Sequence, residues 1–285
     1  MAPRISPDEF MASSPQHISP QQYMATAPRG VDGNSEWASR YARELRGVVV
    51  RQANRAPRSL QVHLGPSEIG AACDRQVIGK LAGIPRTNHV SDPWPSICGT
   101  AIHAWLADAF EGDNAREHIL RWVTETKVVP HPDYPGHADL YDALERCVVD
   151  HKCLGPTSLS KVKSVEGPSR RYVVQLLLYA AGVRAAGLPV TRVVLAAWPR
   201  TASTLDGMYV WEHVCTPADE ILIAEVLDQM AARQAAAQMI RDGYLTINQV
   251  AATPDATECL WCPLYRPQAA YDNGPGCPGT VTRRA

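Results

Sequence analysis

In the first part of the chain, apolar residues recur every three or four positions, which predicts amphipathic helices. The clearest run begins at Ser35 and carries an apolar residue at every fourth position from Trp37 to Val49. The same spacing predicts helices over residues 67–83 and 98–112. The buried face of the last helix would carry Ile102, Leu106 and Phe110.

Beyond residue 117 the pattern changes to short β-branched segments bounded by proline, glycine or charged turns. Such segments are typical of β-strands. Five strands are predicted, over residues 118–129, 136–141, 146–153, 190–199 and 207–215.

Two longer helical patterns accompany these strands. Residues 168–187 predict a helix that ends at Gly187, and Thr216, followed by a proline, predicts the start of a helix that runs to about Gly243. The order of elements predicts an α/β fold with a mixed sheet flanked by helices.

The chain divides by composition into four parts. A Pro-, Ser- and Gln-rich arm (1–34) precedes a helical region (35–97), a core (98–243) and a cysteine-bearing segment (244–285). We expect the arm to be mobile, because it shows little hydrophobic periodicity.

Composition and charge narrow the class of protein. Hydrophobic residues make up 45% and charged residues 20%, as in a globular protein, and no apolar run approaches the roughly 20 residues that span a bilayer. The N-terminus has no apolar block of signal-peptide length, so we expect a cytoplasmic protein without a membrane partner. The 28 basic and 29 acidic residues nearly balance, which disfavours a protein that coats DNA by charge alone.

The strongest chemical pattern lies on two neighbouring strands. Asp139 ends one strand, and Asp150 and Lys152 lie two positions apart on the next, so their side chains share one face. Two carboxylates and the carbonyl oxygen of His151 would suit Mg²⁺ or Mn²⁺, which activates water for phosphodiester hydrolysis, with Lys152 beside it. The alternative is a hairpin with solvated charges.

Two helices carry polar residues in apolar surroundings. Gln175 and Tyr179 lie four positions apart on one helical face, and His103 is a lone imidazole in an earlier helix. Taken singly, Gln175 could cap a backbone group, Tyr179 could belong to the core and His103 could be a packed core histidine.

Together these residues resemble the RecB-like branch of the PD-(D/E)XK nuclease superfamily. That branch has a G-x-x-x-H helix, a G-x-x-D and D-x-K strand pair and a Q-x-x-x-Y helix, here Gly99…His103, Gly136…Asp139, Asp150-His151-Lys152 and Gln175…Tyr179. The resemblance implies a restriction-endonuclease-like fold, with His103, Asp139 and Asp150 as metal ligands and Lys152 as the catalytic lysine. It also implies that Gln175 and Tyr179 position DNA or the lysine; Glu125 is a secondary candidate.

Four of the eight cysteines form a possible metal site. In a reducing compartment clustered cysteines indicate metal ligands, and Cys73, Cys259, Cys262 and Cys277 suit a [4Fe–4S] cluster or zinc, with unligated thiols as the third interpretation. The arrangement resembles the iron–sulfur subgroup of RecB-like nucleases, which includes CRISPR-associated exonucleases and the AddB nuclease. There one cysteine before the core and three after it join the ends of the chain, although here the gap from Cys262 to Cys277 is longer. The other four cysteines would be small buried residues.

The expected function is that of a metal-dependent exonuclease on single-stranded or frayed DNA ends, in recombination, repair or phage DNA processing. Recombination or replication proteins are possible partners. The alternative is a non-catalytic iron–sulfur or zinc DNA-binding module on a degenerate nuclease fold. Candidate DNA contacts, each with a structural or solvated alternative, are Lys161, Lys163, Arg170, Arg171, Arg75, Trp94, Trp105, Trp198 and Trp261.

Overall fold

The computed structural model describes residues 36–55, 64–88, 92–256, 258–272 and 274–281, so the predicted mobile arm lies outside the described residues. The chain separates into two compact units, Met1–Ala56 and Pro57–Ala285. In the first unit the predicted helix is confirmed as α3 (Glu36–Arg55), in which Trp37 stacks on Tyr41 with ring centroids 5.0 Å apart.

The second unit is built on a five-stranded sheet in the order β1-β2-β3-β4-β5. All five predicted strands are present, as β1 (Trp122–Val128), β2 (Gly136–Asp142), β3 (Cys147–Leu154), β4 (Arg192–Pro199) and β5 (Tyr209–Val214). Only β3 and β4 are parallel, and the other neighbours are antiparallel. The predicted mixed sheet is therefore confirmed.

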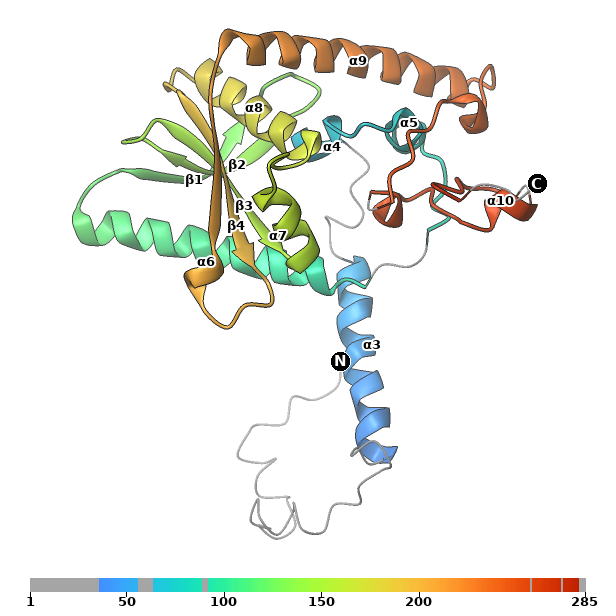
Figure 1. Ribbon diagram of the computed structural model, residues 1–285, viewed down its shortest axis with the longest axis horizontal. Helices are drawn as coiled ribbons and strands as arrows, with labels where there is room; N and C mark the ends of the chain where they lie inside the picture. The colour runs from blue at the N-terminus through green and yellow to red at the C-terminus, as the bar shows by residue number, and fades with distance from the viewer. Residues whose placement is uncertain (1–35, 56–63, 89–91, 257, 273, 282–285) are drawn as a thin grey trace, which may run out of the picture. The chain divides into compact units, whose positions relative to one another are not determined.

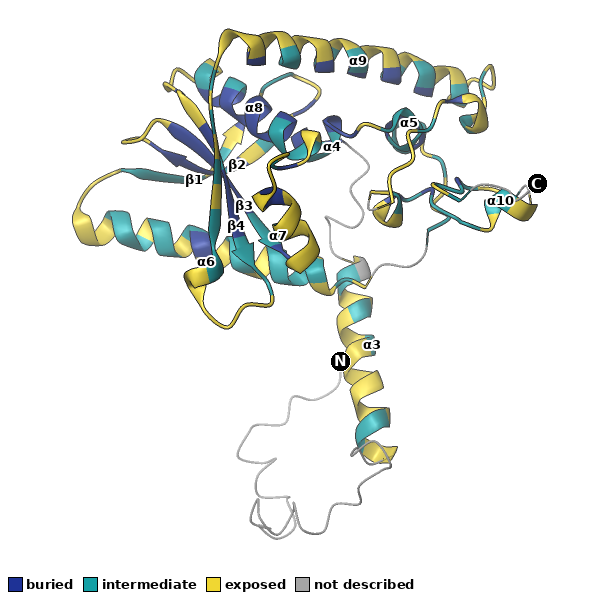
Figure 2. Cartoon of the chain, viewed as in Figure 1, coloured by how far each residue is buried: buried dark blue, intermediate teal, exposed yellow. Residues whose placement is uncertain are grey.

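Helices cover both faces of this sheet (Figures 1 and 2). On one face, α8 (Arg170–Ala185) buries Leu176 and Leu177 against the strands, and α7 (Pro156–Lys163) adds Val162. On the other face, Phe110 of α6 (Trp94–Glu117) packs against the strands. The architecture is α/β, with the sheet between two helical layers.

The long helix α9 (Pro217–Arg241) begins as the sequence predicts. Thr216 is its N-cap and forms a capping box with Asp219, while Val226 and Met230 are buried beneath it. Similarly, α8 ends just before Gly187, whose φ of 87° is a left-handed conformation that glycine adopts without strain.

Some predicted elements differ from the structure. The helix expected over residues 67–83 is interrupted, giving α4 (Pro66–Ile69) and α5 (Asp74–Leu81). The break begins at Gly70, where an added Cβ would lie 2.8 Å from the Val174 side chain on α8. Close packing of this segment against α8 is therefore the physical reason for a glycine here.

Two further differences concern the edges of elements. Between the strand predicted over 146–153 and the helix predicted over 168–187, where no element was predicted, the structure has α7. The helix predicted over residues 98–112 is longer at both ends, so β1 begins at Trp122, four residues later than predicted. A left-handed His118, with φ 52°, ends α6 and separates it from β1.

The C-terminal segment is irregular apart from single turns. These are η3 (Ile247–Gln249), η4 (Cys259–Trp261) and α10 (Ala269–Asp272). A further single turn, η2 (Leu205–Gly207), lies earlier in the chain, before β5. Among the helices that the structure describes, none combines the length and apolar character needed to cross a membrane.

Candidate functional site

Strands β2 and β3 stop pairing where the acidic residues lie. Their register matches Leu140 with Val149, and the next positions along are Asp139 and Asp150. There the backbone N–H of His151 donates instead to Asp139 Oδ2, at 2.7 Å. The side chain of Asp139 thus fills the opening between the strands and lies at the same edge as Asp150.

A third carboxylate comes from β1. Thr124 pairs with Leu140 and Thr126 with Ala138, which puts Glu125 opposite Asp139. The φ of Glu125 is 45°, a left-handed conformation that is uncommon inside a strand for a residue with a side chain. The distortion of β1 therefore coincides with the point where the acidic residues gather.

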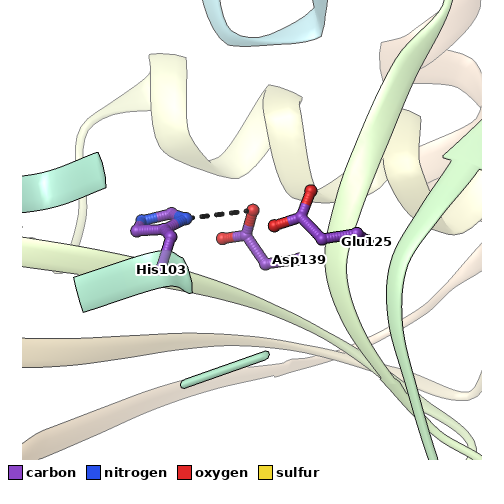
Figure 3. Close-up of side chains that lie close together, drawn as sticks. All are labelled: His103, Glu125 and Asp139. Carbon is purple, nitrogen blue, oxygen red and sulfur yellow. Dashed lines mark ion pairs between the residues drawn. The ribbon is translucent and has the colours of Figure 1, made fainter. Parts of the chain in front are cut away.

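The imidazole of His103 completes this group. His103 Nδ1 lies 3.4 Å from Asp139 Oδ1, and one donor atom each from His103, Glu125 and Asp139 lie within 4.8 Å of one another. Figure 3 shows Asp139 between the other two side chains. Carboxylate and imidazole donors at such separations suit a divalent cation.

Lys152 reaches the site from β3. Its Nζ lies 2.6 Å from Asp150 Oδ2 and donates to Gln175 Oε1 at 3.2 Å. Its side chain is 17% exposed, whereas that of Asp150 is 1% exposed. The predicted common face for Asp150 and Lys152 is therefore confirmed, with the ammonium group as the more accessible member.

Gln175 and Tyr179 are buried and join the same network. Gln175 Nε2 donates to Asp150 Oδ1 and to the Tyr179 hydroxyl, both at 3.0 Å. One amide thus contacts the carboxylate, the lysine and the tyrosine at once, which fixes the orientation of all three. Gln175 hydrogen-bonds side chains of the site, in contrast to the alternative in which it caps a backbone group.

Charges within the site shift the ionisation of its members. The hydrogen bond with Asp139 raises the pKa of His103 above its usual value, against the effect of burial. Burial opposes ionisation of Asp139, but His103, Lys152 and the His151 N–H outweigh it and hold the pKa of Asp139 below its usual value.

Asp150 behaves in the opposite way. Burial, reinforced by the negative charge of Asp139, raises the pKa of Asp150 to about 6 despite the attraction of Lys152. Together with Glu125, these two carboxylates outnumber the ammonium and imidazole groups beside them, and carboxylates gathered in this way suit a bound divalent cation.

The side chain of His151 lies on the opposite face of the sheet from those of Asp150 and Lys152. Its ring stacks on Phe110 with centroids 5.8 Å apart, and Trp198 donates its indole N–H to His151 Nδ1 at 3.3 Å. Burial lowers the pKa of His151 to about 4, so the ring is neutral. Its carbonyl oxygen remains a predicted ligand.

The candidate DNA contacts differ in how far they are engaged by other parts of the protein. Arg171 donates to Ser67 O at 2.6 Å and Arg170 to Gly70 O at 3.3 Å, so both tie the segment around α4 to the start of α8. Lys163 lies over the Tyr209 ring. Of the four candidate tryptophans, Trp94, Trp105 and Trp261 are exposed, whereas Trp198 contacts His151.

The four cysteines predicted to bind a metal line one pocket. Cys73 precedes α5, Cys259 and Cys262 flank η4, and Cys277 lies in a bridge with Tyr265. All eight cysteines of the chain are free thiols. Two segments almost two hundred residues apart in sequence therefore contribute four cysteines to the lining of one pocket.

Each of these sulfur atoms faces an N–H donor. The backbone N–H groups of Thr253 and Asp255 donate to Cys73 and Cys259 at 3.4 Å, and that of Leu264 bonds Cys262. Arg75 Nη1 donates to Cys277 Sγ at 3.7 Å. Such donors accompany metal-bound sulfur. In the thiol form burial outweighs them, and it raises the pKa of Cys259 above its usual value and that of Cys262 to about 11.

Comparisons with known proteins complete the description. Neither a protein-family model nor a curated protein sequence matches the chain. Two solved structures resemble it at 64% coverage of this chain and a TM-score of 0.44. They are an alkaline exonuclease from Laribacter hongkongensis (11% identity, 91% of that chain) and the same enzyme in complex with dAMP (13% identity, 93% of that chain). Similarity this low adds nothing to the geometry.

The role of Glu125 was only a secondary expectation from the sequence. Its position opposite Gly136-His137-Ala138-Asp139 could have indicated it, since residues on neighbouring strands meet in register. Its backbone conformation left no signal in the sequence. The sequence indicated Arg75 as a DNA contact, whereas its guanidinium lies at the thiol pocket.

Proposed function

We propose that this protein is a metal-dependent deoxyribonuclease that hydrolyses phosphodiester bonds, acting as an exonuclease at single-stranded or frayed DNA ends. The observation that carries the proposal is the meeting of Asp139, Asp150 and Lys152 where β2 and β3 separate. A carboxylate pair beside an accessible ammonium group suits a negatively charged phosphodiester that needs both a cation and a proton donor.

We propose His103, Asp139 and Asp150 as the ligands of Mg²⁺ or Mn²⁺, with the carbonyl oxygen of His151 as a further donor. The gathered donor atoms of His103, Asp139 and Glu125 support the first two and add Glu125 as a ligand. The bound ion would lower the pKa of a water molecule and offset charge on the phosphate. Hard oxygen donors fit either ion, and one imidazole is more typical of Mn²⁺ than of Ca²⁺ sites.

Lys152 would act on the phosphate itself. An ammonium group has three N–H donors, so Lys152 can keep Asp150 and Gln175 as partners while it donates to a phosphate oxygen or to the attacking water. Gln175 would hold Nζ in place, because its carbonyl oxygen accepts from Lys152 while its N–H groups stay with Asp150 and Tyr179.

We also propose that the four cysteines hold one metal centre with a structural role, a [4Fe–4S] cluster or zinc. Support comes from their shared pocket and from the N–H donor at each sulfur. The colour and metal content of anaerobically purified protein distinguish the centres, since a brown protein with iron indicates the cluster and a colourless one with zinc indicates Zn²⁺.

The nuclease proposal is tested with end-labelled single- and double-stranded DNA. We expect cleavage with Mg²⁺ or Mn²⁺ and none with EDTA. Lys152→Ala should lose about 10²- to 10³-fold in cleavage rate, because the transition-state charge is no longer offset. Lys127→Ala is the matched control, as Lys127 is an exposed lysine on β1 that is not among the residues proposed to bind metal or DNA. Cleavage by folded Lys152→Ala at the wild-type rate would remove the catalytic assignment. DNA binding without cleavage by the wild type would favour a non-catalytic module.

A further inference from the structure

Arg75 joins the two segments that carry the cysteines. Its Nε and Nη2 donate to Val250 O at 2.9 and 2.7 Å, and Nη2 also donates to Asn248 O at 3.1 Å. Its backbone N–H bonds Ala251 O at 3.1 Å. The residue two positions after Cys73 is thereby fixed to the segment that leads to the other cysteines.

The same guanidinium touches a sulfur atom. Arg75 Nη1 lies 3.7 Å from Cys277 Sγ, across 202 positions of sequence. It is the charged donor among the four N–H groups that face the sulfurs, since those at Cys73, Cys259 and Cys262 come from backbone amides. A cationic donor stabilises a thiolate more strongly than a neutral one.

From these contacts we infer that Arg75 is the positioning residue of the four-cysteine metal centre. It holds the Cys73 segment against the C-terminal segment before metal is bound, and it stabilises the negative charge on the Cys277 sulfur afterwards. The inference rests on the proposed metal centre and extends it, because it assigns both the assembly of the ligand set and part of its electrostatics to one side chain.

A second arginine provides the control. Arg233 of α9 is 2% exposed and donates to Ile69 O and Ala71 O at 3.2 and 3.0 Å, and its Nη2 lies 2.7 Å from Asp74 Oδ1. It therefore anchors the same segment, but none of its hydrogen bonds in the described residues goes to a cysteine sulfur. Loss of Arg233 should reduce stability in general, whereas loss of Arg75 should change the metal centre itself.

The test compares wild type, Arg75→Gln, Arg75→Lys and Arg233→Gln, all loaded anaerobically. Four properties of each protein are measured: the metal content, the visible or near-ultraviolet spectrum, the rate of metal loss to a chelator and, where iron is present, the reduction potential. We expect Arg75→Gln to hold metal about 10- to 100-fold more weakly, the usual effect of removing a residue that supports metal ligands. An iron–sulfur cluster should also become harder to reduce, because the cation that favours the more negative state is gone. Arg75→Lys should lie between wild type and Arg75→Gln.

Arg233→Gln should unfold at a lower temperature but lose metal at the wild-type rate while folded. The inference is overturned if the folded Arg75 variants lose metal at the wild-type rate and keep its spectrum, or if Arg233→Gln matches Arg75→Gln in both. A wild type that takes up neither iron nor zinc at its thiols would overturn the metal centre, and the inference with it. Each result is independent of DNA cleavage, so a failure here is separate from a failure of the nuclease proposal.

Discussion

At the scale of single residues, the site combines groups that burial and charge pull in different directions. Asp139 is held ionised by His103 and Lys152, whereas burial favours the protonated form of Asp150. Lys152 and Gln175 keep that buried carboxylate in place. A divalent cation would relieve the excess of negative charge, so ionisation and metal binding are coupled.

This coupling predicts that metal binding weakens as pH falls. Asp150, with its pKa raised to about 6, and His103, with its pKa raised above the usual value, must each lose a proton to act as ligands. Titration calorimetry with Mn²⁺ should show an affinity that decreases from about pH 8 to about pH 5.5, with proton release on binding. An affinity that does not change over this interval would exclude these two residues as ligands.

A second residue-scale prediction concerns the backbone of Glu125. Its φ of 45° is unfavourable for a side-chain-bearing residue, so Glu125→Gly should increase the free energy of unfolding by about 0.5–1 kcal/mol. The same change removes a carboxylate from the site and should weaken Mn²⁺ binding. Urea unfolding and Mn²⁺ titration measure the two effects. Lys127→Gly, two positions along the strand, is the control and should lose stability.

The sequence predicted that most of these side chains lie together, because their proximity depends on spacing. Asp150 and Lys152 share a face through the two-residue period of a strand, and Gln175 and Tyr179 through the helical repeat. The left-handed Glu125 and the sulfur contact of Arg75 depend on how distant segments pack, which no local pattern encodes.

At the scale of elements, the start of α9 is held by a compact polar cluster. Asp219 accepts from the Thr216 N–H at 2.6 Å, and His213 Nε2 lies 2.9 Å from its carboxylate. Burial opposes ionisation of Asp219, but these bonds outweigh it and hold its pKa below the usual value.

Asp219→Asn should therefore destabilise the protein by about 1 kcal/mol at neutral pH, because the cap loses its charged acceptor. A depressed pKa contributes stability that is present above the unfolded-state pKa and is lost as pH falls through the folded-state value. The difference in unfolding free energy between wild type and variant should thus shrink below about pH 4. A difference that stays constant from pH 7 to pH 3 would contradict this account of the cap.

Elements were predictable where a local signal marked them, such as the Thr216-Pro217 start of α9 or the β-branched residues of the five strands. Short helices without such a signal were not predictable. The polar segment from Pro156 to Lys163 has little apolar periodicity, with Val162 as its buried residue, and the sequence therefore gave no sign of α7. The break after Ile69 follows from close packing of Gly70 on α8, which is a tertiary contact.

At the scale of the whole molecule, the second unit joins a sheet that carries the catalytic candidates to a C-terminal segment with little regular structure. That segment contains three of the four cysteines of the pocket. A segment so poor in helix and strand needs other constraints, and a metal centre supplies them.

Removal of the metal should therefore loosen the C-terminal segment while the sheet remains folded. After chelation, limited proteolysis should cut within residues 244–281, and the melting temperature should fall by several degrees, as expected for a loss of about 1–2 kcal/mol in a chain of this size. Cys259→Ser should reproduce the effect without chelator, and Cys215→Ser, outside the pocket, should not. Unchanged proteolysis after complete metal loss would show that the centre does not stabilise this segment.

The central claim is that His103, Asp139 and Asp150 bind a cation that Lys152 assists. It is tested most directly by Mn²⁺ binding, followed by electron paramagnetic resonance, in the same samples that are assayed for DNA cleavage. We predict that the wild type binds Mn²⁺ and cuts, and that Asp139→Asn does neither. Lys152→Ala should bind Mn²⁺ at least as tightly as the wild type, because the ammonium group that repels the ion, 2.6 Å from Asp150, is gone. The same variant should fail to cut DNA. Wild-type Mn²⁺ affinity in folded Asp139→Asn, or cleavage that persists in Lys152→Ala, would contradict it.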